Sequence, residues 1–220
     1  KERTFMKVLA INGSPRKTWN TADMLEAALE VAAAQGAETE YIHLYDYNCK
    51  GCRSCFACKR IGSPSLGKCA VQDDLTPILE KILAADVVLF GQPIYFGHIS
   101  SGMWTLLERL WFAGMNYDST YSTNYPKNVV CGMIFTMNSP DDTFYDALIT
   151  HLCGNMSRLV GPTEHFSVTN TLQFDNYDHY ISSAFDAKAK TEWHENEYPK
   201  QKAQLQTWVT ELTRTAADRN

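Results

Sequence analysis

Five of the seven cysteines lie within 21 residues: Cys49, Cys52, Cys55, Cys58 and Cys69. They form two overlapping Cys-x-x-Cys-x-x-Cys triplets, one ending at Cys55 and one at Cys58, and Cys69 offers a fourth ligand to either. Three thiolates at this spacing can wrap a 4Fe–4S cluster, with the fourth ligand coming from further along the chain. The alternatives are a structural zinc site, whose usual paired spacing is followed poorly, and free redox-active thiols. The pattern favours metal or redox chemistry over a disulfide framework.

A second candidate site is the loop 13–21, Gly-Ser-Pro-Arg-Lys-Thr-Trp-Asn-Thr, which follows an apolar run and precedes a helical pattern. Free backbone N–H groups and the positive end of the helix dipole meet at such a helix start, which suits a phosphate. Ser14, Thr18, Asn20 and Thr21 add neutral donors, and Arg16 adds positive charge. The loop lacks the endings of a P-loop and of a dinucleotide site. It predicts a mononucleotide phosphate site, against the simpler alternative of a turn in which Asn20 or Thr21 caps the helix.

The segment 91–100, Gly-Gln-Pro-Ile-Tyr-Phe-Gly-His-Ile-Ser, follows another apolar run. Pro93 fixes the backbone, and the pair Tyr95 and Phe96 offers aromatic surface against which a flat ring can pack. Aromatic packing beneath an ordinary loop is the alternative. His98 is placed to assist proton delivery, although a surface histidine held by a hydrogen bond is the simpler interpretation.

These loops belong to a chain in which predicted strands and helices alternate. Strict alternation predicts an α/β fold, a doubly wound five-stranded parallel sheet with helices on both faces. In the flavodoxin-like strand order 2-1-3-4-5, ligands bind where the order reverses, between strands one and three, which is where the loops 13–21 and 92–98 meet. We predict strands near 5–12, 38–44, 87–91, 128–136 and 164–169, and helices near 21–35, 73–83, 103–111, 139–159 and from Pro199 onward.

Taken together, the two loops resemble those of the NAD(P)H-dependent FMN reductase group of flavodoxin-like proteins. The segment from Cys49 to Cys69, followed by Asp73-Asp74, resembles the iron–sulfur flavoprotein branch, and the resemblance covers about residues 6–160. It implies an FMN cofactor whose phosphate is held by Ser14, Arg16, Asn20 and Thr21. It further implies that Pro93, Ile94, Tyr95, Phe96 and Gly97 line the isoalloxazine, with Met137, Asn138 and Ser139 flanking the cofactor.

The resemblance implies an oxidoreductase that transfers electrons from NAD(P)H to a small acceptor such as a quinone, nitro or azo compound. Because such chemistry belongs to the cofactor, we predict no catalytic side chain. The alternatives are an iron–sulfur flavoprotein that carries electrons from ferredoxin, and a flavin-dependent redox sensor. One departure from the family pattern weakens the cluster interpretation: ten residues separate Cys58 from Cys69, where the cluster-binding relatives have a short gap.

The remaining features limit the partners. The 220 residues, 45% of them hydrophobic, fit a single domain spanning 1–220, with a Cys-rich loop at about 47–72. The net charge of −5 gives no sign of a nucleic-acid or anionic-membrane partner, and no apolar run approaches the ~20 residues that span a bilayer. Without a signal-peptide pattern, we expect a cytoplasmic protein; the resemblance adds a homodimer or homotetramer. Residues 170–216 are expected to form a C-terminal arm, covering the active site or a dimer interface, and a final helix.

Overall fold

The computed structural model describes residues 5–219, so the first four residues and the last residue of the predicted 1–220 domain lie outside it. Five strands form one parallel sheet, and their spatial order is the predicted order 2-1-3-4-5. In that order they are β2 (Glu38–His43), β1 (Lys7–Asn12), β3 (Val87–Tyr95), β5 (Val130–Thr136) and β6 (Thr163–Val168). A sixth strand that we did not predict, β4 (His98–Ile99), pairs antiparallel with the end of β3.

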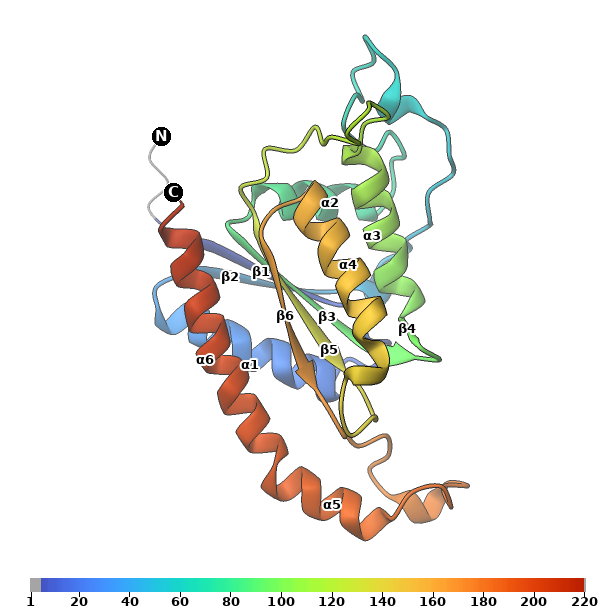
Figure 1. Cartoon of the computed structure of the whole chain (residues 1–220), viewed down its shortest axis with the longest axis vertical. Helices are drawn as coiled ribbons and strands as arrows, with labels where there is room; N and C mark the ends of the chain where they lie inside the picture. The colour runs from blue at the N-terminus through green and yellow to red at the C-terminus, as the bar shows by residue number, and fades with distance from the viewer. Residues whose placement is uncertain (1–4, 220) are drawn as a thin grey trace.

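Helices cover both faces of the sheet, as predicted (Figure 1). On one face lie α1 (Asn20–Ala34) and α6 (Tyr198–Ala217). On the other face lie α2 (Leu75–Ala84), α3 (Ser101–Gly114) and α4 (Asp146–Leu159). This arrangement leaves the carboxyl ends of the strands free to carry the connecting loops.

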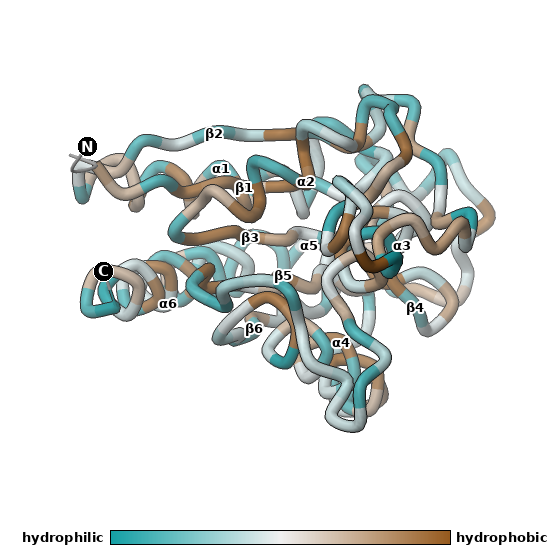
Figure 2. Tube along the Cα trace, turned by 90° about the horizontal axis from the view of Figure 1, so that it is seen from above, coloured by the Kyte–Doolittle hydropathy of each residue, from teal (hydrophilic) through white to brown (hydrophobic). Residues whose placement is uncertain are grey.

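The central strands are apolar on both sides because each side meets a helical layer. In β3, Val88 and Phe90 belong to the core shared with α2, α3 and α4, whereas Val87 and Leu89 belong to the core shared with α1 and α6. Figure 2 draws β3 mainly in brown, while the edge strand β2 carries more polar residues. At Gly91 an added Cβ would lie 2.6 Å from Cδ1 of Leu25, so glycine lets α1 approach β3 beside the end of the sheet.

One predicted helix boundary needs correction, and one helix was not predicted. The helix predicted from residue 139 begins at Asp146, because Asp141 accepts hydrogen bonds from the backbone and side chain of Thr143 and forms a local turn instead. The segment 170–198, for which we predicted an arm and no helix, contains helix α5 (Ala187–Asn196). This helix has no apolar stripe; Asp186 caps it by accepting from the backbone N–H of Ala189 at 3.0 Å.

No helix in the part of the chain that the structure describes combines the length and apolar character needed to cross a bilayer.

Candidate functional site

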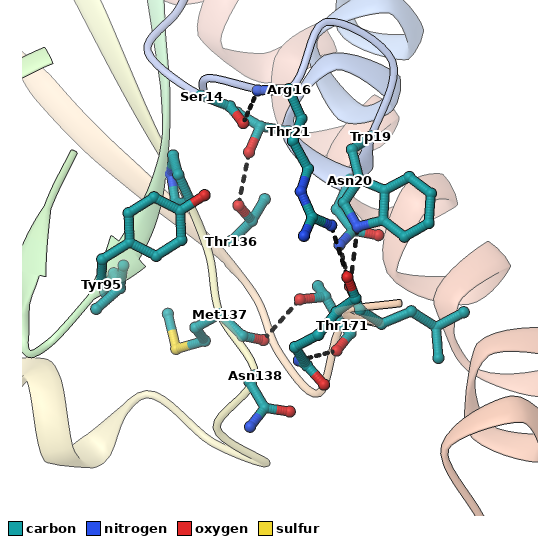
Figure 3. A pocket seen from close by; sticks show the side chains of 14 residues that line it. Ser14, Arg16, Trp19, Asn20, Thr21, Tyr95, Thr136, Met137, Asn138 and Thr171 are labelled. Atoms are coloured by element: carbon teal, nitrogen blue, oxygen red, sulfur yellow. Dashed lines mark hydrogen bonds between the residues drawn. The ribbon is translucent and has the colours of Figure 1, made fainter. Parts of the chain in front are cut away.

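A pocket of about 170 Å³ opens at the carboxyl ends of β1, β3 and β5, where the sequence analysis expected ligand binding (Figure 3). Four segments build its walls: 14–21 after β1, 93–95 at the end of β3, 136–138 at the end of β5, and 171–173 after β6. These segments are far apart in sequence and meet because parallel strands end at the same edge of a sheet.

Nine of the thirteen residues predicted to contact or flank a cofactor line this pocket, and four do not. Phe96 and Gly97 form the turn between β3 and β4 with left-handed φ values of 50° and 74°, and Phe96 is fully exposed. Thr18 and Ser139 lie beside the walls in sequence but do not line the pocket. The nine that do are Ser14, Arg16, Asn20, Thr21, Pro93, Ile94, Tyr95, Met137 and Asn138.

The loop that follows β1 is held by hydrogen bonds from three strands. The backbone N–H of Gly13 donates to the carbonyl of Gly91 at 2.8 Å, and that of Ser14 donates to Oδ1 of Asn12 at 2.8 Å. Nε2 of the buried His43, on β2, lies 2.8 Å from the carbonyl oxygen of Ser14. These bonds hold the start of the loop against three strands, and such support is what a preformed anion site requires.

The start of α1 does not have the cap expected if this loop were an ordinary turn, in which Asn20 or Thr21 would cap the helix. The helix begins at Asn20, and Trp19 in the N-cap position makes no side-chain cap hydrogen bond. The Asn20 amide instead donates to the carbonyl of Leu172 at 2.8 Å, and the Thr21 hydroxyl pairs with that of Thr136 at 2.7 Å. The idea that Asn20 or Thr21 serves as the helix cap is therefore wrong.

Sequence reasoning missed part of the pocket. Thr136 and the segment Thr171–Gln173 line it, and Trp19 joins them from the first loop. Ligands bind at the carboxyl ends of parallel strands, and residues 171–173 follow the carboxyl end of β6. Their place beside the pocket could therefore have been predicted. Their importance was hidden because the contacts of this segment to Trp19 and Asn20 use a backbone carbonyl.

The pocket wall at the end of β5 includes the Asn138 carboxamide. Its Oδ1 is buried and, among the described residues, has no hydrogen-bond partner. An unpaired buried acceptor is costly, so a donor that reached this carboxamide would be stabilising. Desolvation raises the pKa of the Tyr95 hydroxyl, which therefore stays neutral beside the pocket at physiological pH. These features fit a polar, ring-bearing cofactor.

His98 takes no part in this pocket. Its ring packs edge-on against Trp104 at a centroid distance of 4.9 Å, and its Nδ1 lies 3.3 Å from the carbonyl oxygen of Ile99. This geometry fits the simpler interpretation of a histidine held at the surface.

The clustered cysteines surround a second, smaller cavity. Cys52, Cys55, Cys58 and Cys69 line it together with Arg109 and Phe112 of α3, whereas Cys49 does not. Within the described chain, no three side chains of the metal-binding types are grouped closely enough to hold an ion. Burial raises the pKa of the Cys58 thiol, so this thiol is protonated at neutral pH. The four cysteines share a cavity, and their sulfurs would have to move inward to bind a metal.

Arg109 fixes the two ends of this cysteine loop. Its guanidinium donates to the carbonyls of Lys50 and Val71, both at 3.2 Å, and to Oδ2 of Asp73 at 2.6 Å. Its side chain is fully buried. Because Lys50 precedes the four cavity-lining cysteines and Val71 follows them, one side chain holds both ends of the segment that carries these four.

The fold and the pocket together define a flavodoxin-like protein. A sequence model of the NADPH-dependent FMN reductase family matches residues 6–137, more than half of the chain, and the chain belongs to this family. The match includes the first pocket loop, the segment 93–97 and the cysteine loop. It ends at Met137, before the 171–173 wall.

Known relatives agree with this assignment. An iron–sulfur flavoprotein of Archaeoglobus fulgidus is 42% identical over 113 residues, which cover 51% of this chain and 53% of the relative. One of Methanocaldococcus jannaschii is 40% identical over 104 residues, covering 47% and 51%. The chain thus spans about half the length of the curated relatives it matches. The structure of an FMN-dependent NADH-azoreductase from Bacillus anthracis in complex with FMN shares the fold, with a TM-score of 0.65, 13% identity, and coverage of 94% of this chain and 99% of that one.

Proposed function

We propose that this chain binds FMN in the pocket at the carboxyl ends of β1, β3 and β5 and transfers electrons from NAD(P)H to a small acceptor such as a quinone, nitro or azo compound. The observation that supports this most strongly is that one pocket combines the loop 14–21, whose side chains suit a phosphate, with the apolar and aromatic wall 93–95. Family membership supports the same cofactor and donor.

The proposed roles follow from side-chain chemistry. The Arg16 guanidinium and the Ser14 and Asn20 side chains bind the phosphate, while Pro93, Ile94 and Tyr95 pack against the ring system. The Asn138 carboxamide, in the wall at the end of β5, offers the cofactor a further polar contact. When bound, FMN supplies the hydride and electron chemistry, so these residues bind, orient and exclude water, and no side chain needs to act as acid, base or nucleophile.

The test is an absorption spectrum of anaerobically purified protein, followed by FMN titration and NADH or NADPH oxidation assays with quinone, nitro and azo acceptors. A two-band flavin spectrum and acceptor-dependent oxidation support the proposal. The absence of both FMN binding and NAD(P)H oxidation would refute it. Flavin binding without turnover would favour the redox sensor.

A second candidate function is favoured by the cysteine cavity. In this proposal the chain carries electrons from a ferredoxin through a 4Fe–4S cluster. The proposed ligands are the four cysteines that line one cavity, Cys52, Cys55, Cys58 and Cys69, and Cys49 is not a ligand. The relatives named iron–sulfur flavoproteins support this candidate. The absence of both iron and acid-labile sulfide after anaerobic reconstitution would exclude it.

The choice of ligands has its own test. Cys69→Ser should lose the iron and sulfide of the reconstituted protein, and Cys49→Ser should retain both. Loss of iron in both variants, or only in Cys49→Ser, would contradict the ligand set Cys52, Cys55, Cys58 and Cys69.

We further propose that the chain acts as one FMN-binding domain in a cytoplasmic homodimer or homotetramer. The support for association is apolar surface at the pocket end of the molecule, where Phe96 is fully exposed and Tyr95 is 44% exposed. Mass photometry distinguishes these assemblies from a monomer.

A further inference from the structure

A short segment after β6, residues 170–173, crosses the pocket beside the first loop, and we call it the strap. Three side chains of the loop donate to it: Nη1 of Arg16 to the carbonyl of Gln173 at 2.6 Å, and Trp19 Nε1 and Asn20 Nδ2 to the carbonyl of Leu172 at 3.0 and 2.8 Å (Figure 3). Two of these donors, Arg16 and Asn20, are proposed phosphate ligands. The strap therefore determines how they are oriented.

The strap is fixed at its start by the loop after β5. The backbone N–H of Asn170 donates to the carbonyl of Ser139 at 2.7 Å, and that of Thr171 donates to the carbonyl of Met137 at 3.0 Å. Asn170 adopts a left-handed φ of 52°, which turns the chain from β6 into the strap. The strap is a defined structure rather than a loose connection.

Its other support is an ammonium group from α5. Nζ of Lys190 donates to Oδ1 of Asn170 at 2.6 Å and to the carbonyl of Thr171 at 3.1 Å, and the residue is only 6% exposed. A buried ammonium is costly unless hydrogen bonds satisfy it, and both of these acceptors belong to the strap. Lys190 thus ties α5 to the strap in one geometry.

The donors held by the strap keep capacity for a ligand. A guanidinium has five N–H groups and a carboxamide has two, so one bond each to the strap leaves further N–H groups on Arg16 and Asn20. Holding both side chains in advance reduces the conformational entropy lost when an anion binds. The strap is therefore a support for the anion site and does not use up its donors.

We infer that Lys190 is a positioning residue for the phosphate end of the cofactor: by fixing the strap, it holds Arg16 and Asn20 in the orientation that receives the phosphate. This rests on the proposed FMN function. Lys190 and the strap both lie beyond residue 137, where the family match ends.

The test compares Lys190→Met with Lys188→Met. Lys188 lies on the same helix but is 87% exposed and pairs only with Glu192, at 3.7 Å. Dissociation constants for FMN and for riboflavin, which lacks the phosphate, are measured by flavin fluorescence. We expect Lys190→Met to weaken FMN binding about tenfold, which is ~1.4 kcal/mol, and to change riboflavin binding less than about twofold. Lys188→Met should leave both constants unchanged.

A second variant covers the case in which Lys190→Met does not fold. Trp19→Phe removes the indole N–H that meets Leu172 and keeps a smaller aromatic ring beside the Arg16 guanidinium, which lies 5.1 Å from the Trp19 ring centroid. It should also weaken FMN selectively, and the double variant should lose less than the sum of the two single losses, because both act through the strap.

Equal weakening of FMN and riboflavin would overturn the positioning role, as would unchanged FMN affinity in folded Lys190→Met and Trp19→Phe. Tighter FMN binding would show that the strap competes with the phosphate. If the wild-type protein binds neither flavin, the proposed function itself fails, which is distinguishable from failure of the positioning role alone.

Discussion

The guanidinium Nη1 of Arg109 lies 2.6 Å from Oδ2 of Asp73, with the arginine side chain fully buried and that of Asp73 only 17% exposed. Arg109 projects from α3, and Asp73 lies just before α2, so the pair joins two helices beneath the cysteine loop. Because the arginine would remain buried if its partner were removed, the pair is expected to matter more than a surface ion pair.

Asp73→Asn should therefore lower the free energy of unfolding by about 3 kcal/mol. The substitution keeps Oδ1, which accepts from the N–H of Leu75, so the start of α2 is preserved. Urea unfolding measures the change. The matched control is Asp74→Asn, whose carboxylate meets only the exposed backbone N–H of Asn48 and should cost under about 1 kcal/mol. Equal losses in the two variants would contradict a special role for the buried pair.

Asn20→Ala should reduce FMN affinity by about tenfold, because it removes a phosphate donor and the bond to the strap. Stability should fall by only about 1 kcal/mol, because Asn20 does not cap α1. Isothermal titration with FMN and thermal unfolding separate the two effects. Thr18→Ala, outside the pocket wall, is the control and should change neither. Full FMN affinity in Asn20→Ala would mean that this loop does not hold the phosphate.

Cysteine alkylation at pH 8 should proceed in a fixed order in metal-free, reduced protein. Cys55 is exposed and should react first. Burial raises the pKa of Cys131 to about 12 and that of Cys153 to about 11, so both should react more than about tenfold more slowly. Peptide mass spectrometry follows each site, and all seven thiols should react quickly in denaturant. Rapid labelling of Cys131 in the folded protein would contradict its buried position.

Stability should depend on pH through Lys190. Desolvation lowers its pKa from 10.5 to about 8, so the unfolded chain binds a proton that the folded chain has released between these values. Unfolding therefore takes up a proton in this window, and the Lys190 contribution to stability rises from pH 8 to pH 10 and is lost as the pH falls through 8.

Relative to Lys190→Met, the wild type should gain about 1–2 kcal/mol between pH 8 and pH 10 in urea unfolding. Thiols and tyrosines titrate in both proteins and cancel in the difference. A difference that stays flat with pH would mean that Lys190 keeps its ordinary pKa in the folded protein.

The parallel sheet could be predicted because strands and helices alternate and the run 87–91 is continuously apolar, which indicates a strand covered on both faces. The strand order came from the flavodoxin-like pattern that this alternation matches. The first pocket loop was predictable because Ser14, Arg16 and Asn20 carry hydrogen-bond donors next to the start of a helix. Helix α5 was not, because its buried anchor is a lysine rather than an apolar stripe.

The strap could not be predicted from residue types, since its bonds to Arg16, Trp19 and Asn20 use carbonyls that every residue has. Which four of the five clustered cysteines line one cavity depends on the path of the loop, which Arg109 holds at Lys50 and Val71. One signal was available there: Arg109 is a charged residue beside the apolar positions Leu106 and Leu110 of α3, and such a residue needs a buried partner.

The bond between Asn20 and Leu172 joins positions 152 residues apart. During synthesis at ~5–20 residues per second, the first loop therefore leaves the ribosome roughly 8–30 s before the segment that will hold its donors. Until then the nascent chain lacks one wall of the pocket. We therefore expect the flavin to bind tightly only after all five strands of the parallel sheet have been translated.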